Sequence, residues 1–100
     1  MAEALKRLAT PEITVTHDYL NSELMIELDI PGADKEYVDL EMGEHGFCVK
    51  AEGKEVKYDS CATLAHEIVP QEARAKFDAG LLLISVPFRE KVKGHKVAVE

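Results

Sequence analysis

Residues that could carry out chemistry are few, and they are spread along the chain. They are His17, His45, His66, His95, Cys48 and Cys61. His45 and Cys48 are separated by two residues, which is one half of a zinc-binding spacing. A zinc site also needs a second close pair of ligands, and the sequence contains none. We therefore predict no metal site.

The sequence also lacks the motifs of common catalytic sites. Ser60 and Cys61 precede His66 by a few residues, but no nucleophile-elbow motif surrounds them. No glycine-rich loop resembles a phosphate cradle, so ATP binding is not predicted. We expect a protein that is not an enzyme and that uses no cofactor. An enzyme remains an alternative only if a pocket gathers His66 with carboxylates.

The two cysteines are too few for a disulfide framework. Cys48 lies inside an alternating pattern that is typical of a strand, where a cysteine usually acts as a small, half-buried hydrophobic residue. We therefore expect both Cys48 and Cys61 to be free, reduced thiols, as is usual in the cytoplasm.

Composition and charge exclude several classes of partner. The chain has 100 residues, enough for one domain, and 46% of them are hydrophobic. Twelve basic and 19 acidic residues give a net charge of −7, which disfavours nucleic acid and anionic membranes as partners. No apolar run reaches the roughly 18 residues of a membrane span, and residues 1–10 lack the apolar stretch of a signal peptide. These features predict a cytoplasmic location.

The elements that must position any site are strands. Apolar and polar residues alternate most regularly over residues 24–30, and Pro31-Gly32 ends that strand. We expect further strands at 13–17, 38–42, 47–52, 56–58, 63–69, 73–77 and 81–86, and a last extended segment at 96–99. The turn-forming pair Asp59-Ser60 is expected to end the strand at 56–58. Residues 1–9 form either a short helix or a frayed tail. The pattern predicts an all-β, immunoglobulin-like antiparallel β-sandwich of seven to nine strands.

Two segments carry a resemblance to a known family. Residues 23–53 and the signature Ala-x4-Gly-Leu-Leu-x4-Pro resemble the α-crystallin domain of small heat shock proteins. The signature consists of Ala75, Gly80, Leu81, Leu82 and Pro87, and Leu81 replaces the family's usual valine. The resemblance implies an N-terminal arm at 1–11, an α-crystallin-type domain at 12–88 and a C-terminal extension at 89–100.

The chain also departs from this family. Gly53 and Pro70 are only seventeen residues apart, which leaves little room for the loop that carries a strand swapped between dimer partners in the family. Residues 64–69 contain no arginine, Phe88 replaces the basic residue that usually follows the signature proline, and the N-terminal arm is short. These departures raise the related CS-domain co-chaperone fold as an alternative.

The resemblance also implies a binding site. In the family, two edge strands border an apolar groove that accepts a client peptide or a C-terminal Ile-x-Ile or Val-x-Val segment of a neighbouring chain. The corresponding residues here are Val38, Leu40, Met42, Ala75 and Phe77, and the plug corresponds to Val97 and Val99. The alternatives are that the five groove residues belong to the core and that 96–99 is an ordinary last strand.

Two functions follow from these expectations. The first is an ATP-independent holdase that binds unfolding polypeptides and associates with itself as a dimer or larger particle. The second is a monomeric adaptor of the CS-domain type that docks on one partner chaperone without holdase activity.

Overall fold

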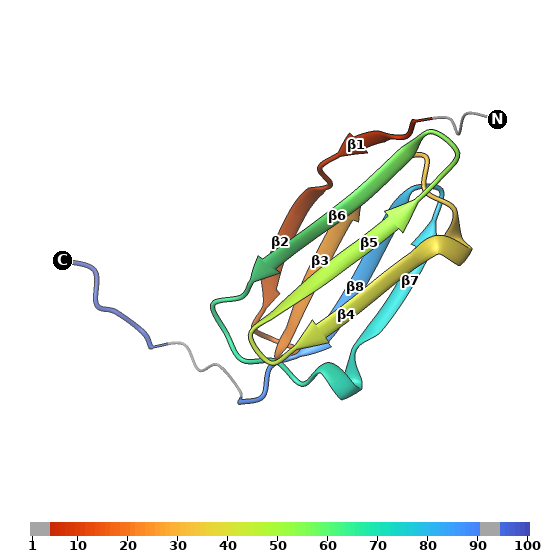
Figure 1. Ribbon diagram of the computed structural model, residues 1–100. Coiled ribbons are helices and arrows are strands. Elements are labelled where there is room, and N and C mark those ends of the chain that lie inside the picture. The colour runs from red at the N-terminus through yellow and green to blue at the C-terminus, as the bar shows by residue number, and fades with distance from the viewer. Residues whose placement is uncertain (1–4, 91–94) are drawn as a thin grey trace.

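The computed structural model describes residues 5–90 and 95–100, and it is a sandwich of two four-stranded sheets (Figure 1). The prediction of an all-β sandwich is confirmed. The strands are β1 (Arg7–Ala9), β2 (Glu12–Asp18), β3 (Glu23–Asp29), β4 (Val38–Gly43), β5 (Gly46–Glu52), β6 (Val56–Thr63), β7 (Arg74–Asp78) and β8 (Leu81–Pro87). Two single-turn 3-10 helices join them, η1 (Lys35–Tyr37) and η2 (Pro70–Glu72). Within the described residues, no helix has the length and apolar character needed to span a membrane.

One sheet has the strand order β1-β6-β5-β4 and the other has the order β2-β3-β8-β7. All strand pairs are antiparallel except β1 and β6, which run parallel. The chain changes sheets at Thr10-Pro11, because β1 pairs in the first sheet and β2 pairs in the second. Proline suits this position because it has no N–H to donate to either ladder.

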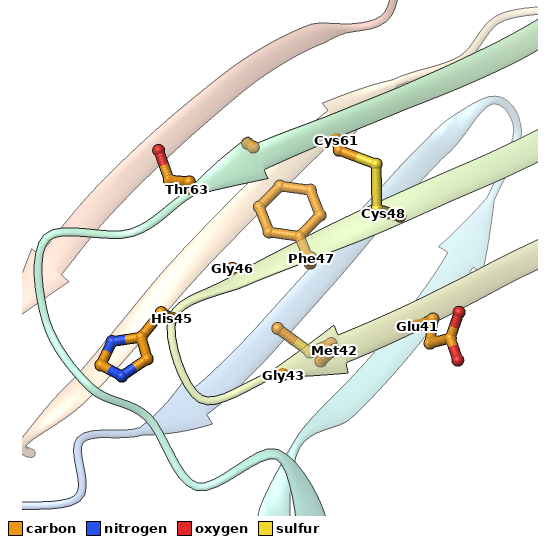
Figure 2. Close-up of a pocket in the computed structure, with 10 residues that line it drawn as sticks. Glu41, Met42, Gly43, His45, Gly46, Phe47, Cys48, Cys61 and Thr63 are labelled. Carbon is orange, nitrogen blue, oxygen red and sulfur yellow. A yellow bond between two sulfur atoms is a disulfide. The ribbon is translucent and has the colours of Figure 1, made fainter.

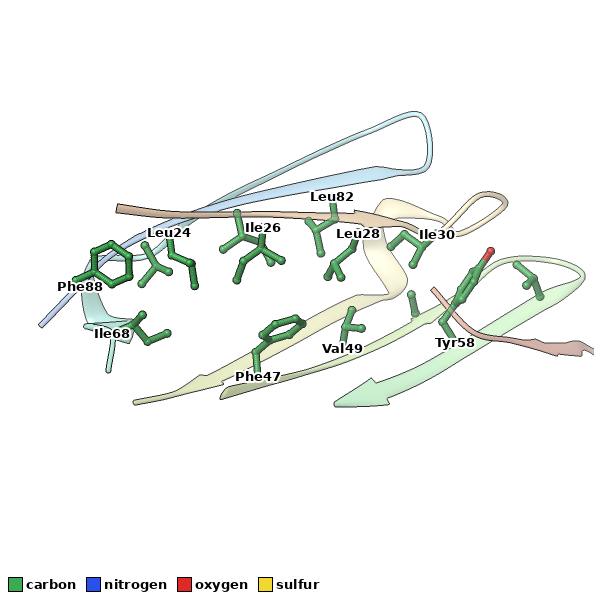
Figure 3. Close-up of a cluster of buried hydrophobic side chains, with 14 residues drawn as sticks. Leu24, Ile26, Leu28, Ile30, Phe47, Val49, Tyr58, Ile68, Leu82 and Phe88 are labelled. Carbon is green, nitrogen blue, oxygen red and sulfur yellow. The ribbon is translucent and has the colours of Figure 1, made fainter. Parts of the chain in front are cut away.

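The core fills the space between the two sheets (Figure 3). Strand alternation places every second residue on the inner face, so the apolar half of β3 is buried while Met25, Glu27 and Asp29 face outward. The fully buried large side chains are Leu24, Ile26, Leu28, Ile30, Val49, Ile68, Ile84 and Val86. Their positions follow the predicted alternation, except that Ile68 lies in a connection outside the named strands.

The signature glycine lies in the hairpin that joins β7 and β8. Ala79 and Gly80 have φ values of 48° and 86°, so both occupy the left-handed region that glycine adopts most easily. The Ile30 N–H donates a 2.8 Å hydrogen bond to the Gly80 carbonyl, which ties this hairpin to the end of β3. Strand β8 ends at Pro87, as expected.

Two element predictions are wrong. Val56–Thr63 is one continuous strand, because Asp59 and Ser60 pair with Lys50 and Val49 instead of forming a turn. Residues 64–69 therefore form a connection, in which only Ile68 makes a bridge, with Phe88. A helix over 1–9 is wrong where it can be checked, since Arg7–Ala9 is a strand; residues 1–4 lie outside the described part. No strand is found within 95–100.

The prediction of free thiols is also wrong. Cys48 and Cys61 form a disulfide between β5 and β6. The register of the two strands places the two residues directly opposite each other, with a Cα–Cα distance of 4.0 Å. A strand that ended at Asp59-Ser60 would have left Cys61 with no position opposite Cys48, which is why the pair was not predicted.

Candidate binding margin between two edge strands

Strands β4 and β7 form one open side of the sandwich. Each is the last strand of its sheet, and each pairs with a single neighbouring strand, β5 or β8. Figure 1 shows the two strands on the same side of the molecule, with β4 in front of β7. We call their inward-facing residues, Val38, Leu40, Met42, Ala75 and Phe77, the open margin. Backbone groups on the outer edges of such strands are available to an added strand.

Strand β4 contributes three side chains to the open margin. Val38, Leu40 and Met42 lie opposite Ala51, Val49 and Phe47, which are all buried. The three β4 side chains are only half-buried, and they pack against the core from its outer side. Because β4 has no strand beyond it in its sheet, each of these side chains keeps some surface for contact with a guest.

Strand β7 contributes two side chains to the open margin, and the two differ in burial. Phe77 is half-buried, packs against the core and lies opposite Leu82. Ala75 lies opposite Ile84 on the same face, but it is exposed. The structure therefore brings all five predicted residues to one side of the sandwich. Four of them contact the core, and the binding role of all five stays a prediction.

The outer faces of the same two strands are charged. Asp39 and Glu41 alternate with the apolar residues of β4, and Arg74, Lys76 and Asp78 do the same on β7. Charged side chains on edge strands disfavour indiscriminate pairing between sheets. The arrangement combines an apolar inner surface with a charged rim.

The predicted plug does not lie on the chain's own sheets. Val97 and Val99 are 77% and 97% exposed, and the segment 95–100 belongs to no strand (Figure 1). The alternative that 96–99 is an ordinary last strand is therefore wrong. Docking of this segment on another chain stays a prediction.

The fold brings together one group of possible metal ligands that was not predicted from the sequence. Ligand atoms of Glu44, His45 and Glu67 lie within 4.8 Å of one another. Arg89 forms ion pairs with both carboxylates of this group, because its guanidinium nitrogens lie 2.9 Å from Glu44 Oε1 and 3.5 Å from Glu67 Oε2. The cluster is therefore an ion-pair network that joins two loops to the end of β8. Only the fold brings these residues together, so spacing in the sequence gave no signal.

The histidine considered for catalysis lies among aromatic rings. The His66 ring centroid is 5.2 Å from that of Phe88 and 5.3 Å from that of His17. Tyr19 completes the group, at 6.5 Å from His66. The His66 ring therefore packs against other aromatic rings close to the end of β8.

Comparison with known proteins gives the same architecture. No protein-family model and no curated protein matches the chain. Among solved structures, heat shock protein 16.0 from Schizosaccharomyces pombe is similar over 92% of this chain and 99% of its own, with a TM-score of 0.73 and 20% identity. The protein hspA from Xanthomonas axonopodis is similar over 84% and 98%, with a TM-score of 0.71 and 15% identity.

A third similar structure is a small heat-shock protein from Xylella fastidiosa that has a distinct high-order structure. It matches 99% of both chains, with a TM-score of 0.66 and 15% identity. The TM-scores show that the chain shares the fold of these proteins, and at 15–20% identity the similarity extends to the fold alone. The chain therefore has the α-crystallin β-sandwich, the fold of the small heat shock proteins.

Proposed function

We propose that the protein is an ATP-independent chaperone of the small-heat-shock-protein type, which holds unfolding polypeptides in solution. The observation that carries the proposal is the open margin, an apolar surface framed by two edge strands of an α-crystallin sandwich. An unfolding chain exposes the two things that this surface can take up, namely apolar side chains and unpaired backbone groups.

The binding energy would come from two sources. A guest in extended conformation adds backbone hydrogen bonds along β4 or β7, and its alternate side chains cover Leu40, Met42 or Phe77. Burial of apolar surface is non-directional and is worth roughly 25 cal/mol per Å². Little sequence specificity is therefore expected. The net charge of −7 helps to keep the loaded complex in solution.

Two further features belong to this proposal. We expect self-association into a dimer or larger particle, as implied by the exposed Val97 and Val99. We also expect a cytoplasmic location. Disulfides are rare in the cytosol, so at this location we expect the Cys48–Cys61 bond to be reduced in part of the molecules.

The test compares two substitutions at opposite sides of the sandwich. Leu40→Ser removes an apolar side chain from the open margin, whereas Ile13→Ser removes a half-buried side chain that packs against the same core from β2. Wild-type protein should suppress light scattering by a heat-stressed client without nucleotide. Leu40→Ser should weaken this suppression, and Ile13→Ser should retain it at matched folded fractions, verified by circular dichroism.

Two results would contradict the proposal. One is a lack of suppression by the wild type at several-fold molar excess over the client. The other is equal loss of activity in the two variants, because it would attribute the effect to stability and leave no role for the open margin.

One observation favours the second candidate, a CS-domain-type adaptor. Strand β6 continues to Thr63, and residues 64–69 then lead almost directly to η2, with no swapped strand in the described part of the chain. An adaptor of this kind is expected to be a monomer. Molar mass from light scattering therefore separates the candidates, since a monomer without client protection would favour the adaptor.

A further inference from the structure

We propose that the Cys48–Cys61 disulfide is a reversible thiol–disulfide exchange site for small thiols, and that Cys61 Sγ is the atom they attack. The inference is independent of the chaperone proposal. It depends on the position of the bond on the outer face of a sheet, on the unequal exposure of its two cysteines, and on an open hollow beside it.

The bond lies on the outer face of the first sheet. On β5 the residues on either side of Cys48, Phe47 and Val49, are buried, so Cys48 points away from the core. Cys48 is half-buried, whereas Cys61 on β6 is exposed. A reagent in solution therefore reaches Cys61 more readily than Cys48. Access to one sulfur is a main determinant of which sulfur is attacked.

A hollow of about 740 Å³ lies next to the bond, and Figure 2 shows its lining. Gly43 and Gly46 face each other across β4 and β5, and Thr63 follows on β6. This row adjoins the row of Glu41, Cys48 and Cys61, and the missing side chain of Gly43 leaves open space beside the disulfide. The volume lies within the roughly 300–1,000 Å³ typical of small-ligand sites. It can accommodate the body of a tripeptide thiol such as glutathione.

The sandwich does not depend on the bond for the pairing of β5 with β6. These strands are joined over seven registered residue pairs, from Gly46↔Thr63 to Glu52↔Lys57. Their inner faces also contribute Phe47, Val49 and Tyr58 to the core. Opening the bond therefore leaves the two strands paired. Cys48 and Cys61 can then pass between the dithiol and the disulfide form while the protein stays folded.

The exchange has two steps. A thiolate attacks Cys61 Sγ and forms a mixed disulfide, the Sγ–Sγ bond breaks, and its electron pair leaves on Cys48 Sγ, which takes up a proton from water. A second thiolate then attacks the sulfur of the bound thiol. It releases the oxidised reagent and leaves Cys61 as a thiolate. Two electrons pass from two small thiols to the protein, and the reverse sequence restores the bond.

The first experiment titrates the native 100-residue chain with mixtures of reduced and oxidised glutathione. Thiols are counted by alkylation and mass spectrometry, while far-UV circular dichroism reports the fold. We expect two thiols to appear together with an unchanged spectrum, and to disappear when the mixture is made oxidising. A bond that resists reduction until the chain unfolds would overturn the proposal.

The second experiment assigns the attacked sulfur. Cys48→Ala leaves only Cys61, and Cys61→Ala leaves only Cys48. Each variant is treated with oxidised glutathione at the same pH, and formation of the mixed disulfide is timed. We expect Cys61 to react about tenfold faster because it is the more accessible sulfur. Equal rates, or a faster Cys48, would overturn the assignment to Cys61.

The third experiment tests the hollow. A Cβ at Gly43 would meet nothing within 4 Å, so Gly43→Leu can fill the hollow without disturbing the sheet. Gly46 is unsuitable, since its Cβ would lie 2.5 Å from the Ala62 carbonyl oxygen. Gly43→Leu should slow reduction by glutathione several-fold more than reduction by mercaptoethanol, which is far smaller. Equal slowing by both reagents would remove the hollow from the proposal.

Discussion

Tyr58 joins the two layers of the sandwich by one hydrogen bond. Its side chain is buried, and its hydroxyl donates to the Pro31 carbonyl oxygen at 2.6 Å (Figure 3). Tyr58→Phe keeps the ring and removes the donor, so the carbonyl loses its partner at a part-buried site. We expect a loss of about 1 kcal/mol in the free energy of unfolding. Urea denaturation measures it, with Tyr37→Phe as a control because Tyr37 is 60% exposed. Similar losses in both variants would contradict this account.

Asp18 gives the turn between β2 and β3 a pH dependence. The side-chain amide of Asn21 donates to Asp18 Oδ2 at 2.7 Å and the Asn21 N–H donates to Oδ1 at 3.2 Å, and these bonds lower the pKa of Asp18 below 3.8. A carboxyl whose pKa is lower in the folded state stabilises the fold above its unfolded pKa. That contribution disappears as the pH falls through the folded pKa. Asp18→Asn should therefore destabilise the protein at neutral pH, and the difference from wild type should shrink below about pH 3.8.

The matched control for Asp18 acts on the donor. Asn21→Ala removes the side-chain hydrogen bond to Asp18 Oδ2 and keeps the backbone N–H bond to Oδ1. Thermal unfolding at pH 7 and at pH 3 should show the two single variants losing stability in the same pH range. The double variant should lose less than the sum of the two single losses. Strict additivity would show that the pair does not interact.

At the scale of elements, the end of β5 runs against the loop that follows β3. A Cβ on Gly53 would overlap the backbone oxygen of Gly32, whereas a Cβ on Gly43 would meet nothing within 4 Å. Gly53→Ala should therefore lower the free energy of unfolding by about 1–3 kcal/mol, as overpacking does. Gly43→Ala, at a backbone angle that alanine can adopt, should leave stability unchanged or raise it by about 0.4–1 kcal/mol. Chemical denaturation of both variants measures the difference, and equal effects would contradict the close approach.

The elements also show how far the sequence predicts this fold. The alternation of Leu24, Ile26 and Leu28 with polar residues predicts β3 correctly, because strand period and burial on one face are local properties. The break assumed at Asp59-Ser60 was wrong because turn-forming residues are also compatible with an exposed strand when partners such as Lys50 are available. Register between strands is not a local property, so neither the parallel β1–β6 pair nor the disulfide could be read from spacing.

The residues of the open margin could be placed on edge-side strands for a different reason, and their binding role stays a prediction. The resemblance supplied the two strands, and alternation alone then selected Leu40 and Phe77 as inward residues. Sequence alone could not show that both strands are the last in their sheets, since sheet order depends on the whole topology. Nor could it show that Ala75 is exposed while Phe77 packs against the core.

At the scale of the whole molecule, the described C-terminal segment 95–100 carries two apolar side chains that the chain's own sheets do not cover. Val97 and Val99 are exposed at the C-terminal end, while the open margin offers unpaired strand edges elsewhere on the same chain. A segment with alternate apolar residues can add to a sheet edge of a second copy, with both side chains entering the apolar surface. Deletion of residues 95–100 should therefore lower the molar mass measured by light scattering.

A pair of double substitutions separates specific docking from tail length. Val97→Ser with Val99→Ser removes the two apolar side chains and should lower the molar mass as the deletion does. His95→Ser with Lys96→Ser changes the same tail at two exposed polar positions and should leave the mass unchanged. Because the margin is the proposed acceptor, Leu40→Ser should reproduce the effect of the valine pair, and combining the two should add little. A particle whose mass is the same in all these proteins would mean that its subunits associate through another surface.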